Sequence, residues 1–404
     1  MYLTKLWING IIKAKSADKC IEESYAIILK RGAIMEKDVY RKNADDMIYL
    51  VRCALYGVKP GKERLEQIDL DALFKVCQTH ILTACAAYAL ESAGIRDKAF
   101  TEAKEKAVRK NILLDMERNN IISVLEKEGI WYMPLKGAFL KDWYPKLGMR
   151  QMSDNDILCD PEFRQRIREI MDELGFTGKY TKSCDDAYFK DPVYNYEMHY
   201  TLFTPVFSEK MAEYFGMTRS RLLKDKGNDY GYHFSLEDFY IYLIAHEYKH
   251  YSAGGTGVRS LVDTFVFVRK FKDELDWNYL RTEFAKLGIL GFERQNRSLA
   301  IKLFTGKELS DEQKEMLDYY ITSGTYGTSN TKTRHNIDRF GKGSKAKYIL
   351  YRLFPPMDYI KYYWNFFYRH KWLIPVLWLY RPFHGMSVHR TMLLNEMRSL
   401  KKTK

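Results

Sequence analysis

The apolar pattern of this 404-residue chain changes its period at Gly129, which limits the fold to one that combines helices with strands. Before that point, segments 73–94 and 107–129 place apolar side chains three or four positions apart and end on a glycine. This spacing predicts a helical region from about Lys19 to Gly129. After it, Ile130–Leu135 is a short aromatic and apolar run that fits a buried strand.

The next hundred residues predict a small mixed sheet with helices on one side. Strands are expected at Ser153–Cys159, 176–182 and 193–203, and helices at Ala138–Lys146 and from Asp160-Pro161 to Gly175. The sequence therefore predicts an α+β fold. Four regions are expected: an N-terminal helical region (1–129), an α/β core (130–232), a second helical region (233–330) and a C-terminal end (331–404).

The C-terminal end carries the charge of the whole chain. Residues 331–404 hold 16 basic and three acidic side chains, a net +13 that equals the value for all 404 residues. The same segment is rich in Tyr, Trp and Phe, a mixture that suits contact with nucleic acid or with a membrane surface. The alternative, which we favour from the sequence, is a helical cap that packs on the main body and leaves its Lys and Arg solvated.

Cysteine usage predicts a reduced, cytoplasmic protein. The six cysteines show no C-x-x-C spacing, so neither a disulfide partner nor a thiolate zinc site is expected: Cys20, Cys53, Cys77, Cys85, Cys159 and Cys184. No run approaches the roughly 20 apolar residues of a membrane span, and the first residues lack the pattern of a secretory signal.

Asp154 and Asp156 are the candidate metal ligands. Alternation along a strand places both carboxylates on one face, where they repel unless they share a cation. An all-oxygen site of this kind suits Mg²⁺ or Mn²⁺. Glu197 is a candidate third acid on a later strand, with His199 on its face. Lys136-Gly137 forms a turn before a helix, where an ammonium and backbone donors suit an anion such as a triphosphate.

The succession L-K-G, Arg150, S-D-N-D-I-L and E-M-H resembles bacterial nucleotidyltransferase-like proteins, relatives of the DNA polymerase beta superfamily. The resemblance implies a nucleotidyltransferase core between helical regions. It also implies transfer of a nucleoside monophosphate from an NTP to a hydroxyl of a small molecule, RNA or protein. By the same resemblance, Lys136 and Gly137 bind the triphosphate. Asp154, Asp156 and Glu197 then hold the metals and are catalytic. Lys-Gly stands here where Gly-Ser is usual.

Arg150, four residues before Asp154, has two interpretations of equal weight. Its guanidinium either neutralises phosphate at the nucleotide site or forms a buried ion pair that holds the loop before the strand.

A competing motif lies at His246–His250, which reads H-E-x-x-H, the spacing of zinc hydrolases with Glu247 as the base and Asp263 as a candidate third ligand. However, a helix capped by Ser235 would carry His246 and His250 on its apolar side. We therefore expect a polar cluster beside the site that contacts nucleotide or acceptor, made of His246, His250, Arg259 and Asp263. A zinc metallohydrolase and a catalytically silent interaction protein of the same fold remain the alternatives.

Overall fold

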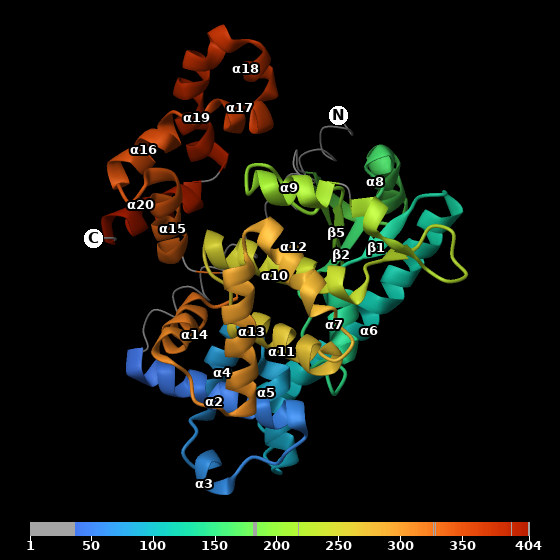
Figure 1. Ribbon diagram of the computed structural model, residues 1–404, viewed down its shortest axis with the longest axis vertical. Coiled ribbons are helices and arrows are strands. Elements are labelled where there is room, and N and C mark those ends of the chain that lie inside the picture. Colours follow the sequence, from blue (N-terminus) through green and yellow to red (C-terminus); the bar gives the residue numbers. More distant parts are fainter. Residues whose placement is uncertain are drawn as a thin grey trace, which may run out of the picture.

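The protein folds as an α+β structure in which helices flank a small five-stranded sheet, beside which lies a two-stranded one (Figure 1). The computed structural model describes residues 37–180, 184–216, 218–325, 327, 329–388 and 390–402. The expected beginning of the helical region near Lys19 lies outside these residues.

The N-terminal region is helical, as the apolar spacing predicts. Its helices are α2 (Lys37–Tyr56), α3 (Lys62–Leu65), α4 (Leu70–His80), α5 (Thr83–Ser92) and α6 (Lys98–Lys127). Gly94 and Gly129 follow α5 and α6 with φ of +83° and +71°, the left-handed conformation that commonly ends a helix. The apolar spacing did not reveal one break: Ile81 adopts φ +54° and separates α4 from α5.

The segment from Tyr132 to His233 contains all the strands of the described residues. Its elements are β1 (Tyr132–Pro134), α7 (Gly137–Trp143), β2 (Asn155–Cys159), η1 (Pro161–Phe163), α8 (Arg164–Glu173), β3 (Thr177–Tyr180), β4 (Asp185–Lys190), β5 (Tyr194–His199), α9 (Glu209–Gly216), η2 (Thr218–Arg221), β6 (Leu223–Lys224) and β7 (Tyr232–His233). The main sheet has the order β1-β2-β5-β4-β3. β2 and β5 run parallel, whereas the other neighbours are antiparallel, so the expected mixed sheet is confirmed.

β4 was missed by the sequence-based prediction. Its segment opens with two acids, which argue against a buried strand, yet Asp186 is fully buried. Arg164 and Arg168 on α8 both donate to its carboxylate, and these charged hydrogen bonds compensate the burial. A local sequence pattern cannot reveal this pairing, because the arginines and the aspartate lie far apart in the sequence.

The two faces of β2 enter different apolar cores, so helices cover both sides of the sheet and the expectation of helices on one side is wrong. Ile157 packs with residues of α6 and α8, among them Ile121 and Ile167, whereas Leu158 packs with α7 and α10. Because side chains alternate along a strand, Asp156 points to the same side as Leu158. Its carboxylate therefore lies on the side of the sheet that α10 covers.

The second helical region consists of α10 (Leu236–Ala253), α11 (Val258–Phe271), α12 (Trp277–Leu287), α13 (Leu290–Thr305) and α14 (Asp311–Ser323). The predicted cap of α10 is confirmed, because the Ser235 hydroxyl accepts a hydrogen bond from the Asp238 amide. Phe239 and Leu243 are buried on this helix, as its apolar pattern indicates.

The C-terminal helices project from the main body, in red in Figure 1. They are α15 (Ser329–Gly341), α16 (Lys345–Leu353), α17 (Met357–Tyr363), α18 (Asn365–Arg369), η3 (Lys371–Leu373), α19 (Ile374–Val388) and α20 (Arg390–Lys402). α15 contacts α10, whereas the helices after it pack mainly on α15 and on one another. That the whole segment forms a cap on the main body stays a prediction. Among the residues described here, every helix is too short or too polar to cross a bilayer.

Candidate metal and nucleotide site

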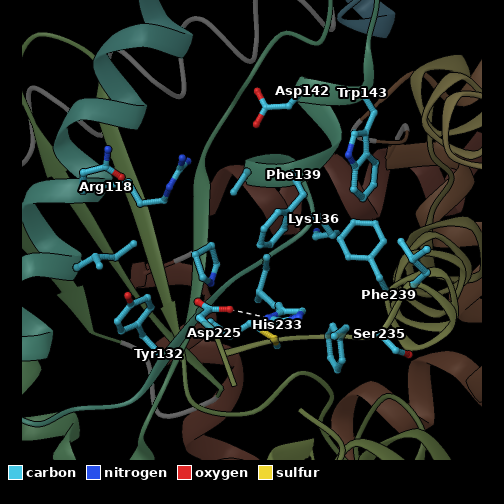
Figure 2. Close-up of a pocket in the computed structure, with 18 residues that line it drawn as sticks. Arg118, Tyr132, Lys136, Phe139, Asp142, Trp143, Asp225, His233, Ser235 and Phe239 are labelled. Carbon is cyan, nitrogen blue, oxygen red and sulfur yellow. Dashed lines mark hydrogen bonds and ion pairs between the residues drawn. The ribbon is translucent and has the colours of Figure 1, made fainter. Parts of the chain in front are cut away.

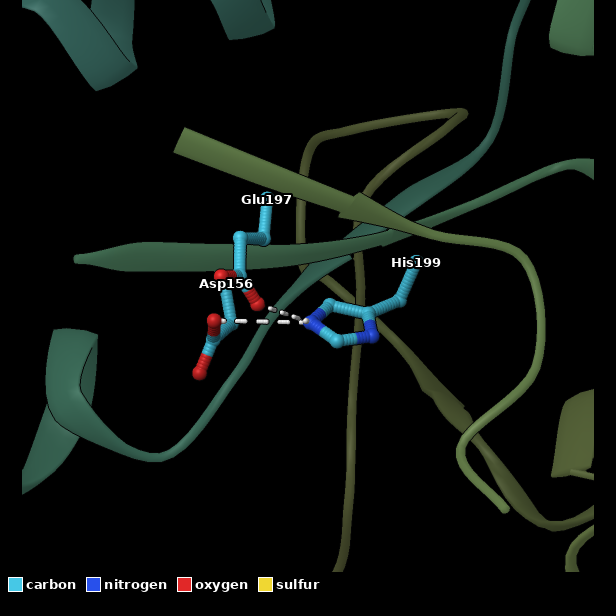
Figure 3. A group of neighbouring side chains, drawn as sticks. All are labelled: Asp156, Glu197 and His199. Carbon is cyan, nitrogen blue, oxygen red and sulfur yellow. Dashed lines mark hydrogen bonds and ion pairs between the residues drawn. The ribbon is translucent and has the colours of Figure 1, made fainter. Parts of the chain in front are cut away.

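Asp156, Glu197 and His199 form a cluster on β2 and β5 (Figure 3). The parallel pairing sets Asp156 directly opposite Glu197, and His199 lies two residues further along β5 on the same face. His199 Nε2 is 3.4 Å from Asp156 Oδ1 and 3.6 Å from Glu197 Oε2. One ligand atom from each of the three lies within 4.8 Å of the others, which is close enough to share a divalent cation.

Cations already surround the Asp156 carboxylate. Lys136 Nζ lies 3.4 Å from its Oδ2. Burial raises the pKa of Asp156, but the attraction of Lys136 and His199 outweighs it and holds that pKa below its usual range. Burial lowers the pKa of His199, yet its hydrogen bonds to Asp156, Cys184 and Glu197 raise that pKa well above the ordinary value. The structure therefore pairs an ionised Asp156 with two positive groups.

The Lys136-Gly137 turn brings the ammonium to this cluster. Lys136 adopts φ +20°, an uncommon conformation for a non-glycine residue and one that concentrates at functional sites. Its Nζ also lies 2.9 Å from His246 Nε2. Burial and the neighbouring Lys136 keep the pKa of His246 well below normal, so its neutral ring can accept from the ammonium. A Cβ on Gly137 would come within 2.7 Å of Met152 and 2.9 Å of Arg150, so this position accepts only glycine without a shift.

Asp154 lies one residue before β2 and outside the ligand cluster. Its Oδ1 accepts from the Ser153 hydroxyl at 2.8 Å, and it attracts the ammonium groups of Lys136 and Lys110. The predicted trio of Asp154, Asp156 and Glu197 is thus gathered only in part, with His199 as the third member of the cluster. The alternation of E-M-H along β5 already put His199 on the face of Glu197. The sequence pattern alone gave no reason to count the His199 imidazole among the metal ligands.

Arg150 is buried against Asp263 of α11. Its Nε and Nη2 donate to the two carboxylate oxygens at 2.8 and 2.9 Å, and the Tyr144 hydroxyl donates to Asp263 at 2.7 Å. Of its two interpretations, the structure shows the ion pair. Arg150 nevertheless contacts the site indirectly, because its Nη1 also reaches Met152 beside Gly137.

Arg259 of α11 donates to the Gln151 carbonyl at 3.1 Å and so holds the same loop as Arg150. Both arginines therefore tie α11 to the segment that leads into β2. A contact between Arg259 and nucleotide stays a prediction.

The H-E-x-x-H helix divides its polar residues between two sides. His246 and His250 lie next to each other, with 3.3 Å between their Nε2 atoms. Glu247 instead points into the core, where its carboxylate accepts from Tyr320, Thr264 and Asn296. Asp263, the candidate third ligand, is occupied by Arg150. Within the described part of the chain, the only group of three or more potential metal ligands is Asp156, Glu197 and His199, so the geometry does not support the zinc hydrolase.

A cavity of about 520 Å³ adjoins Lys136 (Figure 2). Four aromatic side chains from α7, α10 and the loop before α10 form part of its wall: Phe139, Trp143, Phe234 and Phe239. Polar groups come from Arg118 on α6 and from Asp225 and His233, which are hydrogen-bonded to each other. Lys136 lines this cavity and also reaches Asp156, so it connects the cavity with the carboxylate cluster.

Residues 66–305 match a protein family described as "Uncharacterised nucleotidyltransferase". The match covers more than half of the chain and includes Lys136, Asp156, Glu197, His199 and His246, but it ends before the C-terminal helices. No curated protein matches the chain, and no solved structure does.

Proposed function

The chain belongs to this family of uncharacterised nucleotidyltransferases, and we propose that it transfers a nucleoside monophosphate from an NTP to an acceptor hydroxyl. In this reaction the hydroxyl oxygen forms a bond to the α-phosphorus. The bond from that phosphorus to the bridging oxygen breaks, pyrophosphate leaves and the hydroxyl proton is released. The observation that carries the proposal is the position of Lys136, a residue that lines the aromatic cavity and whose ammonium group reaches Asp156.

The residues of the cluster fit a divalent cation. Carboxylates suit Mg²⁺ and Mn²⁺, and an imidazole beside them is tolerated better by Mn²⁺ than by Mg²⁺. Asp156, Glu197 and His199 would hold the ion, which requires His199 to release the proton that it carries in the metal-free protein, and Asp154 is a further carboxylate close by. The chemistry that such an ion supplies is a lowered pKa for the acceptor hydroxyl and neutralisation of charge on the departing pyrophosphate.

The protein's own side chains bind and orient the substrate. Lys136 supplies an ammonium for the triphosphate, and neutral His246 holds that ammonium at 2.9 Å. The aromatic walls of the cavity suit the flat ring of a nucleobase, and a volume of about 520 Å³ lies in the range of small-ligand pockets. We therefore assign the cavity to the nucleoside and the cluster to the phosphates.

The test is a thermal-shift panel with ATP, GTP, CTP and UTP, each with Mg²⁺, with Mn²⁺ and without metal. We expect the melting temperature to rise for at least one NTP only when metal is present, because binding stabilises by roughly 2.7 kcal/mol at a ligand concentration 100 times Kd. The same panel with Asp156→Asn should show no metal-dependent rise. Stabilisation by Zn²⁺ alone, or an equal shift without metal, would contradict the proposal.

A further inference from the structure

One side of α19 presents an apolar stripe to solvent. The α19 stripe consists of Trp372, on η3 directly before α19, and three side chains of α19 itself, with exposed fractions of 77%, 53%, 72% and 68%: Trp372, Val376, Leu379 and Phe383. Their spacing of four, three and four residues is that of one helix face. Scattered exposed apolar residues are ordinary on a protein surface, whereas an aligned row marks an interaction site.

The opposite side of α19 is buried, so the helix is held with the stripe outward. Ile374 and Leu377 pack with Ile360 of α17 in a small core of their own, which Trp364 and Trp378 partly cover. Turning the stripe inward would expose this core instead. The packing of the C-terminal helices on one another therefore holds the stripe toward solvent.

The sequence on either side of the stripe is positively charged. Residues 359–395 contain no Asp or Glu and five basic residues, namely Lys361, Arg369, Lys371, Arg381 and Arg390. Arg369 and Lys371 are exposed and lie three and one residues before Trp372. A row of apolar side chains beside exposed cations is complementary to an anionic lipid surface, which offers hydrocarbon beneath negative headgroups.

We propose that the α19 stripe binds this protein to the surface of membranes that contain anionic lipids. α19 would lie in the plane of the interface with Leu379 and Phe383 among the acyl chains, since it is too short and polar to cross. Trp372 suits the headgroup level, where Trp concentrates. A single-stranded nucleic acid fits less well, because stacking needs rings, and Val376 and Leu379 are aliphatic.

The test is co-sedimentation of the full chain with vesicles of phosphatidylcholine containing 30 mol% phosphatidylglycerol, beside vesicles of phosphatidylcholine alone. We expect binding to the anionic vesicles to exceed binding to the neutral ones at least tenfold and to weaken with salt. Leu379→Glu/Phe383→Glu should reduce it at least tenfold. The matched control is Ile112→Glu/Met116→Glu, two exposed apolar residues one turn apart on α6, and it should bind within twofold of wild type.

A second variant, Arg369→Gln/Lys371→Gln, tests the charges without touching the stripe, and it should lose the preference for anionic lipid. Thermal unfolding of each variant shows whether it is folded. Equal vesicle binding by wild type and the stripe variant, or no binding by wild type, would overturn the proposal. The proposal would also be overturned if the wild type binds single-stranded RNA, or forms a dimer in sedimentation, and the stripe variant does not.

Discussion

His246 and Glu247, adjacent residues of α10, enter two polar clusters of opposite character. Around Glu247, Tyr320, Thr264 and Asn296 donate at 2.7 to 3.1 Å to a carboxylate that is 5% exposed. On the His246 side, Lys136 and His199 each lie 3.4 Å from Asp156, Glu197 lies 3.6 Å from His199, and the Glu197 side chain is 31% exposed. A saturated buried network specifies structure, whereas loosely paired, partly accessible charges leave room for a ligand.

The comparison shows why the H-E-x-x-H match misleads. The motif requires its glutamate to act beside the metal, but the carboxylate of Glu247 is held in the core by hydrogen bonds from Tyr320, Thr264 and Asn296. Glu247 therefore joins the core while His246 joins the site.

The largest effect is expected for Asp156→Asn. Loss of a ligand carboxylate should reduce nucleotide transfer by about 10³-fold, equivalent to several kcal/mol in the barrier. It should also destabilise the protein slightly, because Asp156 is the partner of Lys136 and His199. Nucleotide transfer is measured as the incorporation of label from α-³²P-NTP into a cell extract, and stability is measured by thermal unfolding. Wild-type turnover by the Asp156→Asn variant would show that Asp156 is not part of a catalytic site. The contrast between the two polar clusters would then no longer hold.

Arg150→Met should affect stability most. It leaves Asp263 buried without its cation, which costs about 3–5 kcal/mol in comparable pairs. Denaturant unfolding measures this loss, and Arg150→Met/Asp263→Leu should recover much of it because both charges are gone. If instead the single variant unfolds like wild type but loses NTP affinity, Arg150 belongs with the phosphate contacts after all.

Glu247→Gln should change the pH dependence of stability and leave nucleotide transfer within about twofold of wild type. Burial raises the pKa of Glu247 from 4.5 to about 7. Since the folded state then holds the proton more tightly, this group stabilises the protein below pH 4.5, and that contribution is lost as pH rises through 7. The wild type should therefore lose roughly 3 kcal/mol relative to the variant over this range.

Denaturant titrations of both proteins between pH 4 and 8 isolate this difference, since the remaining groups are shared. A parallel pH profile for the two proteins, or about one zinc per chain in elemental analysis, would place Glu247 in a site rather than in the core.

The smallest effect is expected for Lys136→Met. Loss of one ammonium contact should raise KM for the NTP about 10- to 100-fold with a smaller change in kcat, as removal of a ground-state phosphate contact does. Lys110→Met is the matched control, because Lys110 attracts Asp154 but lies outside the cavity lining. Equal effects of the two substitutions would show a general loss of positive charge rather than a specific contact.

Local pattern predicted much of this molecule. The strand at Asn155–Cys159, the Ser235 cap and the helix ends at Gly94 and Gly129 follow from alternation and glycine conformation, which act over a few residues. The rest depends on distant partners.

Two examples show what such partners decide. The β4 strand needs Arg164 and Arg168 to bury Asp186, and the choice between the two interpretations of Arg150 needs Asp263 on a later helix. His199 joined the site for the same reason, because pairing between β2 and β5 brings it to Asp156.

That single parallel pairing also decides when the site can exist during synthesis. β2 leaves the ribosome before α8, β3 and β4, and β5 follows them, so Asp156 waits for its partner strand until the whole crossover has been made. Closing this loop is a late, non-local event compared with formation of the N-terminal helices. A nascent chain that ends within the crossover thus already has Lys136 and Asp156, but it cannot yet assemble the cluster that Glu197 and His199 complete.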